Sequence, residues 1–172
     1  MLSIAKERAI SLSLQNVIEF KEGDAETIDL PSSTFDAVLC RWGLIYLPDL
    51  RAGLSNIYRS LVNGGRVAAA VWASPDKVPF LSVVMSTVLK ETQNPSPPSG
   101  IPGPFSLADQ KITEAALSET GFKDIAVERM NVIFTYNSPE EYTHFHQAIL
   151  APGHALLADQ SQEKRRDMEC CY

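Results

Sequence analysis

The stretch IEFKEGDAETIDLPSSTFDAVLCRW, residues 18–42, decides how the fold is interpreted, because it holds two strand-like runs and an acidic turn. The first run begins at Ile18 and alternates apolar with polar side chains, which is typical of a strand with one solvated face. The second run, Phe35 to Trp42, is almost continuously apolar and predicts a strand buried on both faces of a parallel sheet. The turn at residues 23–26 is therefore expected at the carboxyl end of the first strand, where open α/β sheets bind their ligands.

Three motifs in this region resemble those of class I S-adenosylmethionine-dependent methyltransferases, in particular the small-molecule group that includes the ubiquinone and menaquinone biosynthesis enzymes. They are G-D-A-E at 23–26, F-D-A-V-L-C-R-W at 35–42, and L-V-N-G-G-R-V at 61–67, which is similar to the family's post-helix turn L-K-P-G-G. They follow the family's order and spacing over roughly residues 1–72. The resemblance implies an α/β, Rossmann-like fold with a mostly parallel sheet and flanking helices, S-adenosyl-L-methionine as cofactor, and methyl transfer to a small organic acceptor.

Parts of the family pattern are missing. A helix is predicted over residues 2–12, and the family's first strand and glycine-rich G-x-G-x-G turn would precede it. We therefore expect an incomplete methyltransferase fold, truncated at the N-terminus and also at the C-terminus, where a final antiparallel strand is not evident. The alternative is a non-catalytic fragment that acts through association with a partner chain, including self-association through exposed sheet edges.

The composition limits the classes of protein to which the chain can belong. The chain has 172 residues, 45% hydrophobic and 21% charged, which suits one globular domain, and a net charge of −6 argues against a nucleic-acid partner. No apolar run is long enough to span a bilayer, and the first residues do not resemble a signal peptide. Three cysteines do not form a disulfide framework, so a cytoplasmic location is expected.

The chain is expected to divide into three parts: a partial cofactor-binding α/β core (1–73), a helical and proline-rich insertion followed by a helix and a strand that complete the sheet (74–138), and a helical C-terminal segment with lid-like character (139–172). The predicted strands cover 18–22, 35–42, 66–72 and 125–136. The predicted helices cover 2–12, a segment capped by Asp49 and ended at Gly64 or Gly65, 80–91, a segment begun by Ser106 and Asp109 and ended at Gly121, and a segment opened by Ser138-Pro139 and broken at Pro152-Gly153.

Methyl transfer from a sulfonium is a single displacement that needs no metal and no covalent intermediate, so cofactor-binding residues are sought rather than a catalytic triad. The resemblance places the adenine contacts at Asp24, whose carboxylate would accept from the exocyclic amine, and at Ala25, whose N–H would donate to a ring nitrogen. It adds Glu26, Cys40 and Arg41 to the cofactor side.

Substrate contacts are predicted at Trp42 and Tyr46, where aromatic rings would shield the sulfonium and stabilise it through cation–π contact. Both residues also suit an ordinary core position, which fits Tyr46 at least as well as the substrate role, and Arg41 suits either an anionic substrate or a surface ion pair. By analogy, the region 80–105 and the helix carrying Tyr142 would cover a partly hydrophobic acceptor.

Other candidates are weaker. Cys40 has no histidine nearby in sequence to activate it and suits a structural position. His144 and His146, two residues apart on a predicted helix, point in different directions and make a poor metal pair. The run 164–166 is too short for nucleic acid binding. Another nucleotide-binding α/β protein is disfavoured because the sequence holds no phosphate-binding glycine loop.

Overall fold

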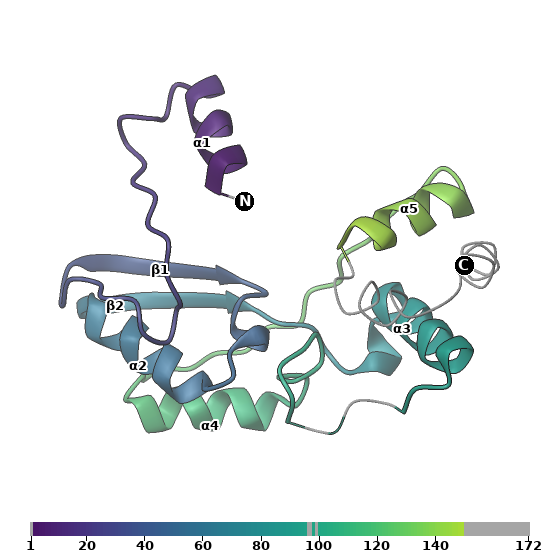
Figure 1. The fold of residues 1–172 in the computed structure, drawn as a ribbon. Helices are drawn as coiled ribbons and strands as arrows, with labels where there is room; N and C mark the ends of the chain where they lie inside the picture. The colour runs from purple at the N-terminus through teal and green to yellow at the C-terminus, as the bar shows by residue number, and fades with distance from the viewer. Residues whose placement is uncertain (1, 96–97, 99, 150–172) are drawn as a thin grey trace.

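The computed structural model of the chain describes residues 2–95, 98 and 100–149 (Figure 1). These residues form a mixed α/β arrangement, as predicted. The helices and strands are, in order, α1 (Leu2–Ser11), β1 (Phe35–Arg41), the short 3-10 helix η1 (Leu44–Tyr46), α2 (Leu50–Ser60), β2 (Leu61–Ala70), the 3-10 helix η2 (Pro75–Lys77), α3 (Pro79–Thr92), α4 (Gln110–Thr120) and α5 (Pro139–Ile149).

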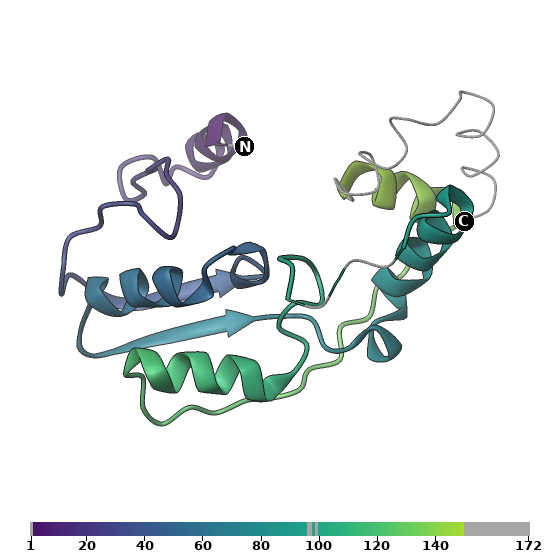
Figure 2. The same cartoon turned by 60° about the horizontal axis from the view of Figure 1, so that its bottom comes forward.

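The sheet of the described residues consists of β1 and β2, which pair in parallel with α2 as the crossover. The register runs from Ala37 opposite Arg66 to Arg41 opposite Ala70, after an irregularity that accommodates extra residues of β2. Gly64 lies in that irregular part with a φ of +78°, a backbone conformation that glycine adopts without strain. Figure 2 shows α2 and α4 lying along the strands, and the two helices contact each other.

The core gathers where η1, α2 and α4 meet the carboxyl ends of the strands. Its buried members are Leu44, Ile45, Leu54, Leu107 and Ala116, and half-buried residues that include Leu50, Ile57, Val71 and Leu117 pack against them. The prediction that 35–42 is buried on both faces is wrong, since Leu39 is 83% exposed and β2 is also largely exposed after Leu61. A parallel strand is buried only where neighbouring strands and helices cover it, and β1 has one described neighbour.

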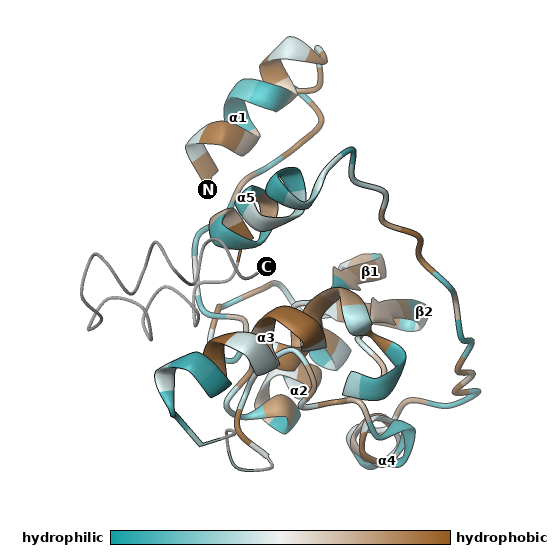
Figure 3. Cartoon of the chain, turned by 90° about the vertical axis from the view of Figure 1, so that its right-hand side faces the viewer, coloured by the Kyte–Doolittle hydropathy of each residue, from teal (hydrophilic) through white to brown (hydrophobic). Residues whose placement is uncertain are grey.

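Two predicted strands do not form. Residues 18–22 and 125–136 carry the alternation of a strand, but neither is assigned to a sheet. The alternating pattern indicates only that the side chains would suit one face of a sheet. A strand also needs a neighbouring strand that pairs with its backbone N–H and C=O groups. Helix α1 stands apart from the sheet (Figure 3), and much of its apolar surface, including Ile4 and Ile10, is exposed.

The N-caps of two helices were predicted correctly, because a cap depends on residues close to it in the sequence. Asp49 Oδ1 accepts from the Ala52 N–H at 3.0 Å, and Asp109 Oδ1 accepts from the Lys111 N–H at 2.9 Å. Gly121 ends α4 with a φ of +111°.

Three details of the predicted helix ends are wrong. Helix α2 ends at Ser60 rather than at Gly64 or Gly65, because Leu61 is already extended and begins β2. Ser106 does not cap α4, since its hydroxyl donates to the Ile45 carbonyl at 2.8 Å. At α5, Ser138 Oγ accepts from the Glu141 N–H as expected, but the Glu141 carboxylate accepts from the Asn137 N–H, one residue earlier than in a standard capping box.

The predicted break at Pro152-Gly153, the basic run 164–166 and the cysteine pair Cys170-Cys171 lie outside the described residues. Among the helices that are described, none combines the length and the apolar character needed to cross a membrane.

Candidate functional site

The acidic segment at residues 24–28 forms a compact turn on the surface. One carboxylate oxygen of Asp24 accepts from the Glu26 N–H at 2.9 Å. The Asp24 carbonyl accepts from the N–H groups of Thr27 and Ile28 at 3.1 and 2.7 Å. These bonds fix the backbone around Asp24 although no strand precedes it.

The two groups that the resemblance assigns to adenine are both available in this turn. The Asp24–Ala25 peptide is trans, so the Ala25 N–H points opposite to the Asp24 carbonyl and therefore away from the turn. Within the described part of the chain, this N–H and the second carboxylate oxygen of Asp24 have no hydrogen-bond partner, and both residues are exposed. The turn therefore exposes one unpartnered acceptor and one unpartnered donor on adjacent residues, and these are the two kinds of group that the resemblance calls for.

Glu26 has a structural role that the motif did not indicate. Its carboxylate accepts from the Asp49 N–H at 2.8 Å, at the start of α2. A carboxylate in this position satisfies an unpaired donor and interacts favourably with the positive end of the helix. Glu26 thereby fastens the acidic turn to α2.

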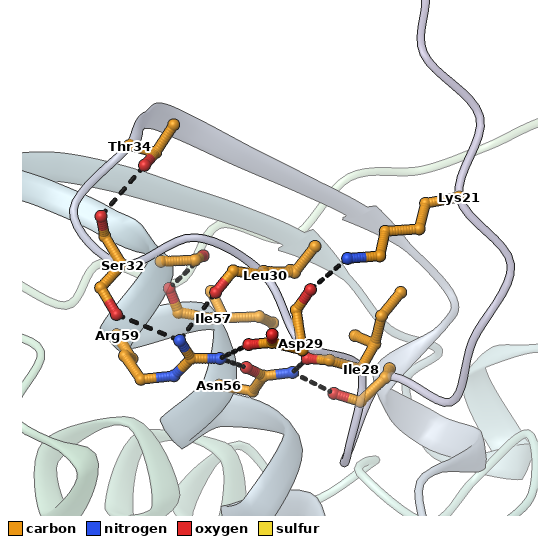
Figure 4. A network of polar contacts seen from close by, with 11 residues as sticks. Lys21, Ile28, Asp29, Leu30, Ser32, Thr34, Asn56, Ile57 and Arg59 are labelled. Carbon is orange, nitrogen blue, oxygen red and sulfur yellow. Dashed lines mark hydrogen bonds and ion pairs between the residues drawn. The ribbon is translucent and has the colours of Figure 1, made fainter.

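Asn56 and Arg59, which sequence reasoning did not single out, complete this attachment (Figure 4). The Asn56 amide donates to the carbonyls of Ala25 and Ile28 at 3.1 and 2.8 Å. Arg59 donates to the Leu30 carbonyl at 2.7 Å and to the Asn56 side-chain oxygen at 2.7 Å. Their spacing of three residues on one helix was the available signal, but most of their partners are backbone carbonyls, which no sequence pattern reveals.

The other predicted site residues lie at the carboxyl end of β1. Trp42 adopts a φ of +58°, uncommon for a bulky side chain, and its N–H donates to the Ala70 carbonyl at 2.9 Å. Its ring stacks on Trp72 with centroids 4.5 Å apart and planes 11° apart. The Arg41 guanidinium lies 5.1 Å from the centre of the Trp42 ring. Trp42 therefore already makes one cation–π contact, with a residue of the chain itself.

Cys40 and Tyr46 lie two residues before and four residues after Trp42 in the chain. Cys40 is half-buried against the core, which suits the structural position predicted for it. Tyr46 ends η1 and is 54% exposed, so its ring is free to contact a ligand. The predicted site residues thus fall into two groups. One is the Asp24 turn, which α2 holds, and the other is at the end of β1, where Trp42 bonds to β2 and stacks on Trp72.

An aromatic layer extends from Trp72 towards α5. Phe80 and Phe134 stack with centroids 3.9 Å apart, and Phe80 also contacts His146 at 4.7 Å. His146 is 2% exposed, and neither ring nitrogen has a hydrogen-bond partner among the described residues. Burial lowers the pKa of His146 below its usual value.

Two open clefts border these elements. One of about 460 Å³ lies between the start of α2 and α4 and contains no predicted site residue. The other, of about 370 Å³, runs between residues 26–29 and the face of α2 that carries Asn56 and Arg59. In the part of the chain that the structure describes, no cluster of three or more His, Cys, Asp or Glu residues is arranged to hold a metal ion.

Comparison with known proteins agrees with the motifs. Residues 1–69 match the family described as "Methyltransferase domain". The ubiquinone/menaquinone biosynthesis C-methyltransferase of Bradyrhizobium sp. is 35% identical over 66 residues, which cover 38% of this chain and 26% of the relative. The demethylmenaquinone methyltransferase of Deinococcus radiodurans is 36% identical over 75 residues, 44% of this chain and 30% of the relative.

A longer match reaches the demethylmenaquinone methyltransferase of Bacteroides fragilis, 24% identical over 139 residues. It covers 76% of this chain and 57% of the relative. The chain thus spans between about a quarter and just over half of the curated relatives it matches.

Proposed function

We propose, from the premise that residues 1–69 belong to the class I S-adenosylmethionine-dependent methyltransferases of the ubiquinone/menaquinone type, that this chain binds the adenine end of that cofactor and takes part in methyl transfer to a small organic acceptor. The observation that carries the proposal is the Asp24 turn. Among the described residues, it leaves a carboxylate oxygen of Asp24 and the N–H of the next residue, Ala25, without hydrogen-bond partners on a backbone that the turn fixes.

When bound, the cofactor supplies the electrophilic methyl group. The chain's own residues bind the cofactor and orient it towards the acceptor. Asp24 and Ala25 hold the adenine, and Glu26 holds their turn against α2. The Trp42–Trp72 stack presents aromatic surface at the carboxyl end of the sheet, where ligands of α/β proteins bind.

The acceptor that we propose is a planar, quinone-type molecule. The relatives are named for ubiquinone and menaquinone biosynthesis and for demethylmenaquinone. The aromatic layer formed by Trp72, Phe80 and Phe134 supports such an acceptor, because flat rings pack well against aromatic side chains.

Calorimetric titration of the full chain with S-adenosylhomocysteine tests the cofactor half of this proposal. We expect saturable binding that weakens about tenfold or more in Asp24→Ala, since hydrogen bonds to charged groups contribute about 1.5–3 kcal/mol. Asp36→Ala is the matched control, because it removes an exposed carboxylate from β1, outside the turn. Absence of binding by a folded chain, or equal weakening in both variants, would contradict the assignment.

A second candidate is association with a partner chain, including a second copy. The specific observation in its favour is the exposure of β1, whose apolar Leu39 is 83% exposed and whose sequence otherwise suits a covered strand. In this alternative, the chain would contribute a partial sheet to a larger assembly rather than act by itself.

A further inference from the structure

The segment between α1 and β1 depends on α2 for much of its order. It forms no strand, and apart from Glu26, Ile28 and Leu30 most of its residues from Lys21 to Thr34 are exposed. A segment with so little buried apolar surface has little to oppose its conformational entropy. Most of the long-range polar contacts that hold it come from α2 and its cap (Figure 4).

Asn56 is the centre of these contacts. It is 9% exposed, and it uses both amide hydrogens, one on the Ala25 carbonyl and one on the Ile28 carbonyl. Its side-chain oxygen accepts from Arg59, which fixes the orientation of the amide. An amide is required here, because a carboxylate of the same shape cannot donate to two carbonyls.

The hydrogen bond from the Asn56 amide to the Ala25 carbonyl restricts the backbone around Ala25. The Ala25 carbonyl is bound to Asn56, and the preceding carbonyl, of Asp24, is bound inside the turn. The first of these bonds fixes the peptide between Ala25 and Glu26, and its Glu26 N–H donates to the Asp24 carboxylate, whereas the bonds of the Asp24 carbonyl fix the peptide that carries the Ala25 N–H. The side chain of Asn56 therefore sets the geometry of two groups that it does not contact.

We propose that Asn56, oriented by Arg59, is a positioning residue for adenine recognition, which holds the Ala25 N–H and the Asp24 carboxylate at a fixed separation before the ligand arrives. The inference rests on the proposed function. A site ordered in advance binds more tightly because less conformational freedom is lost on binding. The role would appear both in affinity and in the ability to distinguish adenine from a base without the exocyclic amine.

The test compares wild type, Asn56→Asp and Asn63→Asp. The control makes the same chemical change at an exposed asparagine in the irregular part of β2. Amide hydrogen exchange without ligand is measured first. We expect the amides of Glu26, Thr27 and Ile28 to exchange about tenfold faster in Asn56→Asp, with α4 unchanged and the control like wild type, since loss of a hydrogen bond of typical strength has about this effect.

Binding of S-adenosylhomocysteine and S-inosylhomocysteine is then measured for each variant. We expect wild type to prefer the adenosyl ligand by about tenfold, and Asn56→Asp to lose most of that preference, because the Asp24 carboxylate is no longer held in place. A purely structural defect would weaken both ligands equally and leave the ratio unchanged.

The outcomes separate the two proposals. Unchanged exchange in a folded Asn56→Asp chain, or faster exchange with an unchanged adenosyl-to-inosyl ratio, would overturn the role of Asn56. Failure of wild type to bind either ligand would overturn the proposed function, and the exchange rates would still show whether Asn56 orders the turn.

Discussion

At the scale of single residues, His146 is the side chain whose burial most clearly lowers the stability of the folded chain. Its ring is enclosed by Phe80, Tyr142 and Phe145, and neither nitrogen is bonded within the described residues. A buried polar group without a partner costs about 1–3 kcal/mol, and a charged one costs more. The ring is therefore held neutral, which is why its pKa is lowered.

This predicts an acid-sensitive fold. Well above a pH of 6.5, the ordinary pKa of histidine, the ring is neutral in both the folded and the unfolded chain. As the pH falls below that value, the unfolded chain takes up the proton first, so the free energy of unfolding decreases. His146→Leu should raise the free energy of unfolding by about 1 kcal/mol near neutral pH and flatten its decrease below pH 6.5.

Urea unfolding at a series of pH values measures this difference. His144→Leu is the matched control, because it makes the same substitution at an exposed position of α5. If both variants show the same stability and pH dependence as the wild type, the burial of His146 has no energetic consequence and the account of this residue is wrong.

The predictable part of the site consists of residues whose role is local. The motif at 23–26 assigns the adenine contacts to Asp24 and Ala25, which stays a prediction; within the described residues, one carboxylate oxygen of Asp24 and the Ala25 N–H have no hydrogen-bond partner. Asn56 and Arg59 were not predictable, because their partners are mostly backbone carbonyls about thirty residues away. The stacking of Trp42 on Trp72 was not predicted either, because it joins residues that are distant in the sequence and depends on where two paired strands end.

At the scale of elements, the helices were predicted from the sequence more accurately than the strands. Caps at Asp49 and Asp109 act within a few residues, so their effect is visible in the sequence. The runs at 18–22 and 125–136 have strand patterns without strand partners. A sheet depends on a neighbour that can come from any part of a chain, and local pattern does not supply it.

The exposed strand β1 predicts association. An uncovered strand rich in apolar side chains pairs readily with another chain, and a charge on it opposes such pairing. We expect the chain to associate as its concentration is raised, and Leu39→Lys to shift it towards the monomer. Sedimentation velocity measures both effects.

Ile4→Lys provides the comparison, since it places the same charge at a 68% exposed position of α1. Association that is unaffected by Leu39→Lys, or reduced equally by both variants, would show that β1 is not the contact surface. A chain that remains monomeric at all concentrations would contradict the association candidate in this self-associating form.

At the scale of the whole molecule, the structure joins a small core to segments that extend from it. The core lies where η1, α2 and α4 meet the sheet, whereas the Asp24 turn and the aromatic layer with α5 lie beside it. The turn is held chiefly through α2, so the cofactor half of the proposed site is tied to the best-packed part of the chain. This arrangement lets adenine binding be tested without an acceptor.

The most direct test of the central claim is an NMR titration of the isotope-labelled full chain with S-adenosylhomocysteine, followed through its backbone amides. We predict saturable shifts centred on Ala25 and extending to Glu26 and Thr27, because the Ala25 N–H is the donor that we propose for the adenine ring. A folded chain whose Ala25 amide does not respond at saturating ligand, or whose shifts cluster elsewhere, would contradict the claim that the Asp24 turn binds the cofactor.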